Sequence, residues 1–342
     1  MTNKWLDKKY PKVNYIGNKE KLSEWIVDNL PITEGTVLDA FAGGCSVSYE
    51  LKKRGFKVYS NDVLYSSYVL SKALIENNSQ TLGIEHIYSA LNNEINIETR
   101  ESLNWLENKL FYSDEVNELA KLIHYSEELE GYEKYLFISL IRRAMIRKLP
   151  YSKMNVSWKS IVKLRDEDYS YEKYGRRRAY HNQSFSHHML SNIEDYNNAV
   201  FDNDKLNRSY QLDIFELLEE IDFVDVIYLD PPYPGTMNKY NDFYQPFDKI
   251  FSKEKNNTDL TNNSDFLEIL ENIIVKSIDK TNCYILSINS KSNPGLKEIE
   301  QIFKKYGVVK VIKRKHNYQV SGKSTKNKNV EKLIILEVQN GV

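Results

Sequence analysis

The sequence predicts an α/β fold built on a mostly parallel sheet of about seven strands. Residues 37–39 form a short apolar strand that turns through small residues into a helix and then into a second strand at 57–60. Residues 224–229 form a continuous apolar run, which is typical of a strand buried on both faces. Segments with helical spacing alternate with these strands, and this alternation favours parallel strand order.

The individual elements follow from local patterns. Apolar residues recur at helical spacing over 22–30, and Pro31 ends that helix. The helix after the first strand covers 46–54, where Gly55 suits a C-terminal cap. After the run at 224–229 we expect a helix at 266–278, a strand at 283–288, a helix at 296–306 and a closing pair of strands at 308–312 and 333–338.

The middle of the chain differs from the rest in composition and pattern. Residues 76–207 are rich in Glu, Asn, Tyr and Lys, with helical patterns around 101–129 and 132–147 and no clear pattern between 149 and 186. No alternation of strand and helix is visible there. We therefore expect one domain formed by 1–75 and 208–342, interrupted by a largely helical domain inserted at 76–207.

Composition excludes several classes of protein. The 342 residues include 41% apolar side chains, too many for a disordered chain, and no apolar run reaches the length of a membrane span. The start of the chain is polar and rich in lysine, so we expect no secretory signal. Only two cysteines are present, which favours a reducing compartment, the cytoplasm. The six histidines do not combine with the cysteines into a metal-ligand spacing, so we expect no metal site.

A turn of small residues joins the first strand to its helix. Residues 40–44 read Ala-Phe-Ala-Gly-Gly, and they follow Asp39 directly. Small residues at such a turn let backbone N–H groups approach a ligand closely. The next strand ends at Asp62, and a carboxylate at that position suits the two hydroxyl groups of a ribose. The pattern fits NAD, FAD or S-adenosylmethionine equally well, and the simpler alternative is a tight turn that binds nothing.

The tetrapeptide Asp230-Pro231-Pro232-Tyr233 is the most informative stretch of the chain. It ends the most apolar strand, at the edge of an open sheet where ligands bind. A carboxylate that accepts one N–H of an exocyclic amine, followed by a ring that stacks on a flipped base, suits methylation of that amine by S-adenosylmethionine. The simpler alternative is a strand-ending diproline followed by a buried tyrosine.

These motifs together resemble the Dam-like (D12 class) family of adenine-N6 DNA methyltransferases. Residues 14–19 with Leu22 resemble the N-terminal cofactor motif of this family, 39–44 resemble its glycine motif, and 230–233 resemble its catalytic motif. The resemblance covers roughly 10–75 and 208–340. It implies a Rossmann-like S-adenosylmethionine-dependent methyltransferase fold in which 1–75 and 208–342 are catalytic and 76–207 recognise the DNA target.

The resemblance also implies site residues. The catalytic set is Asp230, Pro231, Pro232 and Tyr233. The cofactor set is Tyr15, Gly17, Lys19, Asp39, Phe41, Gly43, Asp62, Asp213 and Asp230. Tyr240, Phe243, Tyr244 and Phe247 resemble the aromatic loop over the family's site, with ordinary packing as the alternative. The chain departs from the family pattern at Cys45, where the family usually has another glycine, and at Asp39, where this class often has glutamate.

Three basic stretches suit contact with nucleic acid. Arg142, Arg143 and Arg147 end one expected helix, Arg176-Arg177-Arg178 lie among tyrosines, and Lys323 belongs to a lysine-rich stretch between the last two expected strands. Each stretch is alternatively an ordinary solvated surface. Since the net charge is only −1, three such stretches indicate a polarised surface.

The sequence therefore predicts a site-specific enzyme that methylates N6 of a flipped adenine in double-stranded DNA with S-adenosylmethionine. A restriction-modification context, with a cognate restriction endonuclease as partner, is part of this expectation. Methylation of cytosine N4, of RNA adenine or of a protein glutamine stays open, although a serine or an asparagine usually replaces Asp230 in the first and last cases. A non-catalytic DNA-binding module that kept the fold is an alternative of a different class, and Cys45 is its only support.

Overall fold

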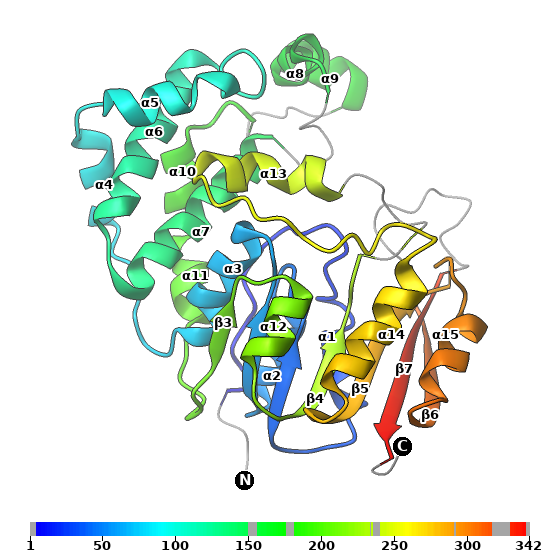
Figure 1. Cartoon of the computed structure of the whole chain (residues 1–342). Coiled ribbons are helices and arrows are strands. Elements are labelled where there is room, and N and C mark those ends of the chain that lie inside the picture. Colours follow the sequence, from blue (N-terminus) through cyan, green and yellow to red (C-terminus); the bar gives the residue numbers. More distant parts are fainter. Residues whose placement is uncertain are drawn as a thin grey trace.

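The structure is a computed structural model that describes residues 5–149, 156–175, 181–232, 234, 240–290, 292–316 and 329–339. Its centre is a seven-stranded sheet, with strand order β3-β2-β1-β4-β5-β7-β6 (Figure 1). The strands are β1 Thr36–Asp39, β2 Lys57–Asn61, β3 Arg208–Tyr210, β4 Val224–Leu229, β5 Thr281–Asn289, β6 Gly307–Lys315 and β7 Val330–Val338. Pairing is parallel from β3 through β5, and β7 runs antiparallel to both β5 and β6. The expectation of a mostly parallel seven-stranded sheet is confirmed.

Helices cover both faces of the sheet. One face packs against α1 (Ser23–Asp28), α2 (Ser46–Lys53) and α3 (Tyr65–Ser71), and the other against α12 (Ile214–Glu220), α14 (Phe266–Ser277) and α15 (Leu296–Phe303) (Figure 1). Alternate side chains of β4 point to opposite cores: Val226 belongs to the first and Ile227 to the second. The strand at 224–229 is therefore buried on both faces, as its continuous apolar sequence predicted.

Most of the remaining helices form a layer beyond the carboxyl ends of the parallel strands, whereas η1 and α11 lie beside the sheet (Figure 1). The remaining helices are η1 Lys72–Glu76 (a π-helix), α4 Glu85–Asn92, α5 Ile97–Ser102, η2 Asn104–Leu106 (a 3-10 helix), α6 Ser113–Glu128, α7 Gly131–Lys148, α8 Trp158–Arg165, α9 Glu167–Tyr174, α10 Phe185–Leu190, α11 Ile193–Ala199 and α13 Tyr240–Ile250. The expected helix at 101–129 is interrupted between Ser102 and Ser113. The stretch expected to lack a pattern, 149–186, contains α8, α9 and the start of α10.

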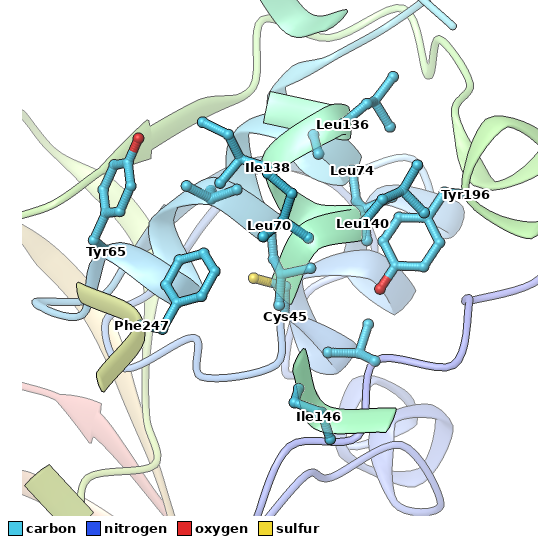
Figure 2. Close-up of a cluster of buried hydrophobic side chains, with 14 of the residues drawn as sticks. Cys45, Tyr65, Leu70, Leu74, Leu136, Ile138, Leu140, Ile146, Tyr196 and Phe247 are labelled. Atoms are coloured by element: carbon cyan, nitrogen blue, oxygen red, sulfur yellow. The ribbon is translucent and has the colours of Figure 1, made fainter. Parts of the chain in front are cut away.

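The helix α7 joins this layer to the sheet. It packs against α3 and η1, and its apolar side chains share one buried cluster with residues of α2 and α3. Figure 2 shows Leu136, Ile138 and Leu140 of α7 beside Leu70 and Cys45. Helix α7, which belongs to the segment 76–207, therefore contributes to the core that also supports the glycine turn. Within the described residues, no helix is long and apolar enough to cross a membrane.

Candidate active site

Three carboxylates lie at one edge of the sheet. Asp39 ends β1, Asp62 follows β2, and Asp230 follows β4, and these strands are neighbours in the order β2-β1-β4. Because the carboxyl ends of parallel strands meet at one edge, the side chains gather there, as the sequence predicted. Their charges are close enough for Asp62 and Asp230 both to raise the pKa of Asp39.

The glycine turn is held by Asp62. Its Oδ2 accepts a hydrogen bond from the backbone N–H of Gly43 at 2.8 Å, and its Oδ1 accepts one from Leu64 at 2.9 Å. Gly43 has a φ of +52°, and a Cβ at this position would lie 2.8 Å from Cε1 of Tyr15. Only glycine combines this conformation with this close approach. Burial raises the pKa of Asp62 to about 6, and the two backbone donors oppose that rise.

Asp39 faces the start of α2 as well as the site. Its Oδ2 accepts a 2.6 Å hydrogen bond from Ser48, whereas its Oδ1 is buried and has no hydrogen-bond partner among the described residues. Burial is the largest cause of a pKa of about 7 for this carboxyl group. A buried acceptor of this kind is costly unless a donor reaches it. The site therefore offers an unused acceptor beside a turn whose backbone a ligand can approach.

The N-terminal loop closes the site from another side. The ring of Tyr15 stacks on Tyr244 of α13, with centroids 4.6 Å apart, and the hydroxyl of Tyr244 accepts a hydrogen bond from the N–H of Ile16 at 2.9 Å. Gly17 has a φ of +80° and carries the chain from Tyr15 towards Lys19. Tyr244 and Phe247 are buried, and the side chains of Tyr240 and Phe243 lie outside the described residues. Phe41 is half-buried and packs against the second core.

Lys19 connects this loop to the catalytic motif. Its Nζ donates to Oδ1 of Asp230 at 2.8 Å and lies 3.4 Å from Oε1 of Glu331. Burial raises the pKa of Asp230 to about 6, the ammonium of Lys19 opposes this rise, and Glu331 adds to it. Pro231 is buried and Pro232 half-buried, whereas Tyr233 lies outside the described residues. At neutral pH Asp230 is thus an ionised acceptor with a charged partner.

Asp213 lies beyond the end of β3 and caps the helix α12. Its Oδ1 caps α12 by accepting from the N–H of Phe215 at 3.0 Å, and its Oδ2 accepts from the N–H of Thr258 at 2.7 Å. Both oxygens are therefore already engaged, which leaves less capacity for the cofactor contact that the resemblance implied.

The basic residues of α7 require a correction. Arg142 is 1% exposed and donates to the carbonyl of Val13 at 3.1 Å, and Arg143 is buried and donates to Asn192 at 3.0 Å. These two side chains do not fit the expected phosphate contacts, because α7 is enclosed by other elements at this point. Arg147 is half-buried. Arg176, Arg177, Arg178 and Lys323 lie outside the described residues.

The sequence reasoning missed several residues that build the site. Asn61 donates to the carbonyls of Ala40 and Leu212, both at 3.1 Å, and so ties two strand ends together. Asp248 of α13 accepts from the N–H groups of Tyr65 and Ser66 at the start of α3, at 2.8 and 3.0 Å. Glu331 was missed because the last strand begins earlier than its apolar run. The sequence offered one signal for it: Glu331 is an acidic residue shortly before the apolar residues of the last strand.

Comparison with known proteins decides the family. A sequence model described as D12 class N6 adenine-specific DNA methyltransferase matches residues 15–320. The chain belongs to this family. It is an adenine-specific DNA methyltransferase, and its sheet has the Rossmann-like arrangement expected for one. The resemblance noted in the sequence is confirmed.

This D12 class methyltransferase is similar to three characterised enzymes. It is 42% identical over 346 residues to the Type II methyltransferase M2.HphI of Haemophilus parahaemolyticus, covering 96% of this chain and 98% of that enzyme. It is 25% identical to the modification methylase StsI of Streptococcus sanguinis, and 28% identical to the Type II methyltransferase M.FokI of Planomicrobium okeanokoites. The last two are longer proteins, of which the aligned parts cover 51% and 34%.

Proposed function

We propose that this D12 class methyltransferase modifies one specific site in double-stranded DNA, at the N6 atom of an adenine flipped out of the duplex, within a restriction-modification system. The family supports the reaction, and the names of the three relatives support the system. One observation carries the assignment of the site: the half-buried carboxylate of Asp230, at the edge of the sheet where β1 also ends, is held by the ammonium of Lys19.

S-adenosylmethionine fits the residues at this edge. The unused acceptor Oδ1 of Asp39 suits the cofactor's amino group, and the ring of Tyr15 against Gly43 offers an apolar surface beside it. The proposed cofactor-binding set is Tyr15, Gly17, Lys19, Asp39, Phe41, Gly43, Asp62, Asp213 and Asp230. When bound, the cofactor supplies an electrophilic methyl group on a positively charged sulfur.

The proposed chemistry needs an acceptor for the adenine amino group. This nitrogen is a poor nucleophile because its lone pair is delocalised into the ring. The carboxylate of Asp230 accepts one N–H and thereby favours a more tetrahedral nitrogen whose lone pair faces the methyl group. Pro231 and Pro232 stiffen the turn that presents Tyr233, and the ring of Tyr233 stacks on the flipped base.

Cys45 does not weaken this proposal. Its thiol lies in the buried cluster with Leu70 and Leu140, as Figure 2 shows, and it is 0% exposed. The residue has a φ of +63°, the conformation for which the family usually has glycine. The departure from the family pattern therefore adds a side chain to the packing behind the turn, which is compatible with a catalytic protein.

The helical layer is the proposed recognition region. The helices α5, α6, α8 and α9 of this region lie beyond the edge that carries Asp230 (Figure 1), and a duplex bound on that side would reach them. Arg147, Arg176, Arg177, Arg178 and Lys323 remain the proposed phosphate contacts, and a cognate restriction endonuclease remains the proposed partner.

Expression in a methylation-free host, followed by long-read mapping of modified bases, tests the proposal. We expect N6-methyladenine at one short recurring sequence, and its absence from cells expressing Asp230→Asn at equal protein level. Mass spectrometry of digested DNA identifies the base. Methylation of cytosine N4, methylation at scattered adenines, or full activity of Asp230→Asn would each contradict a separate part of the proposal.

A further inference from the structure

Glu331 places a second carboxylate behind the catalytic motif. It is the second residue of β7, and because β7 is antiparallel, its beginning lies at the edge where the parallel strands β4 and β5 end. Glu331 is 0% exposed. Its Oε1 accepts a 2.7 Å hydrogen bond from Ser287 of β5 and lies 3.4 Å from Nζ of Lys19. It also lies beyond the residues matched by the family model.

Stability alone does not explain this carboxylate. Glu331, Asp230 and Lys19 together place two negative charges and one positive charge in a nearly dry environment. Removing a carboxylate from water costs several kcal/mol, and one ammonium compensates one carboxylate better than it compensates two. Residues 333–336 of β7 are apolar and buried, so an apolar residue at 331 would suit the core. The extra charge therefore points to a role in the reaction.

We propose that Glu331 is a positioning residue for methyl transfer: it holds Lys19 so that the ammonium bonds Oδ1 of Asp230 and leaves Oδ2 to accept the adenine amino group. This inference rests on the role proposed above for Asp230. The geometry supports it, because Lys19 lies between the two carboxylates and its hydrogen bond to Asp230 goes to Oδ1. A lysine released from Glu331 would be free to bridge both oxygens of Asp230 and compete with the substrate.

Charged groups from several elements interact with Asp230 or with Glu331. Lys19 and Glu331 act on Asp230, Asp230 acts in turn on Asp39 of β1 and Tyr228 of β4, and Glu331 acts on His316, which follows β6. Among these groups, Glu331 raises the pKa of Asp230 and Lys19 lowers it. Neutralising Glu331 therefore lowers the pKa of Asp230 and makes its carboxylate a weaker acceptor.

The test compares Glu331→Gln with Glu337→Gln, a matched change at an exposed position of the same strand. Glutamine keeps an oxygen for Ser287 and removes only the charge. Tritiated methyl transfer to a DNA duplex containing the mapped site is followed from pH 5 to 9. For Glu331→Gln we expect kcat to fall about tenfold, with little change in the KM for DNA. The acidic limb of kcat/KM should move down by about half a pH unit or more. Glu337→Gln should match the wild type in both.

Two further variants separate the possible failures. Glu331→Asp keeps the charge, so its acidic limb should stay near that of the wild type even where shorter reach lowers kcat, and it serves in place of Glu331→Gln if the latter does not fold. Asp230→Asn tests the underlying site. If Asp230→Asn is inactive while Glu331→Gln has the kcat and pH profile of the wild type, the role of Glu331 is wrong and the proposed function stands. If Asp230→Asn is active, the proposed site itself is wrong.

Discussion

Replacing Gly43 by alanine tests the geometry of the glycine turn. The φ of +52° puts the new residue in the left-handed region, at a cost of about 1–2 kcal/mol for a residue with a Cβ. The Cβ would also lie 2.8 Å from Cε1 of Tyr15, so the tyrosine ring has to move. That ring is stacked on Tyr244, and losing the stack costs about 0.5–1.5 kcal/mol. We expect a total loss of about 1.5–3.5 kcal/mol in the free energy of unfolding.

Gly55→Ala is the matched control. Gly55 has a φ of +86°, and a Cβ there would meet its nearest neighbour, Cζ3 of Trp5, at an ordinary 3.6 Å. This variant therefore carries the backbone strain without the collision, and should lose about 1–2 kcal/mol. Urea unfolding gives both values. Calorimetry with S-adenosylmethionine should show affinity unchanged for Gly55→Ala and at least tenfold weaker for Gly43→Ala, because the new Cβ displaces Tyr15 from its place beside the turn. Equal stability and equal affinity in the two variants would refute the reasoning.

Three other expectations follow from the described residues. At Cys45, whose φ is +63°, glycine should give a more stable protein than alanine by about 1 kcal/mol in urea unfolding, the reverse of the order inside a helix. Arg142→Ala should lower the melting temperature without changing the slope of DNA affinity against salt concentration, whereas Arg147→Ala should reduce that slope by about one. The pKa of Asp39 is about 7 in the folded chain and 3.8 in the unfolded chain, so the folded chain holds the proton more tightly. The free energy of unfolding therefore falls as the pH rises from about 4 to about 7, because the buried carboxyl group becomes ionised. Asp39→Asn should therefore stabilise the fold more at pH 8 than at pH 5, and an equal effect at both would contradict the burial of this charge.

The sheet was predictable because its strands are buried on both faces. The apolar run at 224–229 and the diproline after it fixed the end of β4, and the rule that parallel strands end at one edge then brought Asp39, Asp62 and Asp230 together. The three-residue strand β3 is too short to have a periodicity of its own, so its bounds were not predictable from sequence.

The burial of individual polar side chains was not predictable, because it depends on contacts between segments that are distant in the sequence. α3 begins with Tyr65-Ser66-Ser67, whose serines read as polar surface although both are buried beneath other elements. Arg142 read as a surface charge because sequence does not show that α7 is enclosed there. Glu331 was invisible for the opposite reason: a lone acid before an apolar strand looks solvated until a lysine from the other end of the chain is placed beside it.

The enclosure of α7 limits how the proposed recognition region could acquire new DNA specificities. Ile138 and Leu140 fill the same interior as Leu70 of α3, so a chimera that imports 76–207 whole from a relative would mismatch side chains directly behind the glycine turn. Specificity is freer to diverge in the outer helices α8 and α9, which leave that interior intact when their surfaces change. Under the proposed function, substitutions that alter the recognised DNA sequence are therefore expected on the outer helices. Substitutions on α7 would also disturb the core behind the glycine turn.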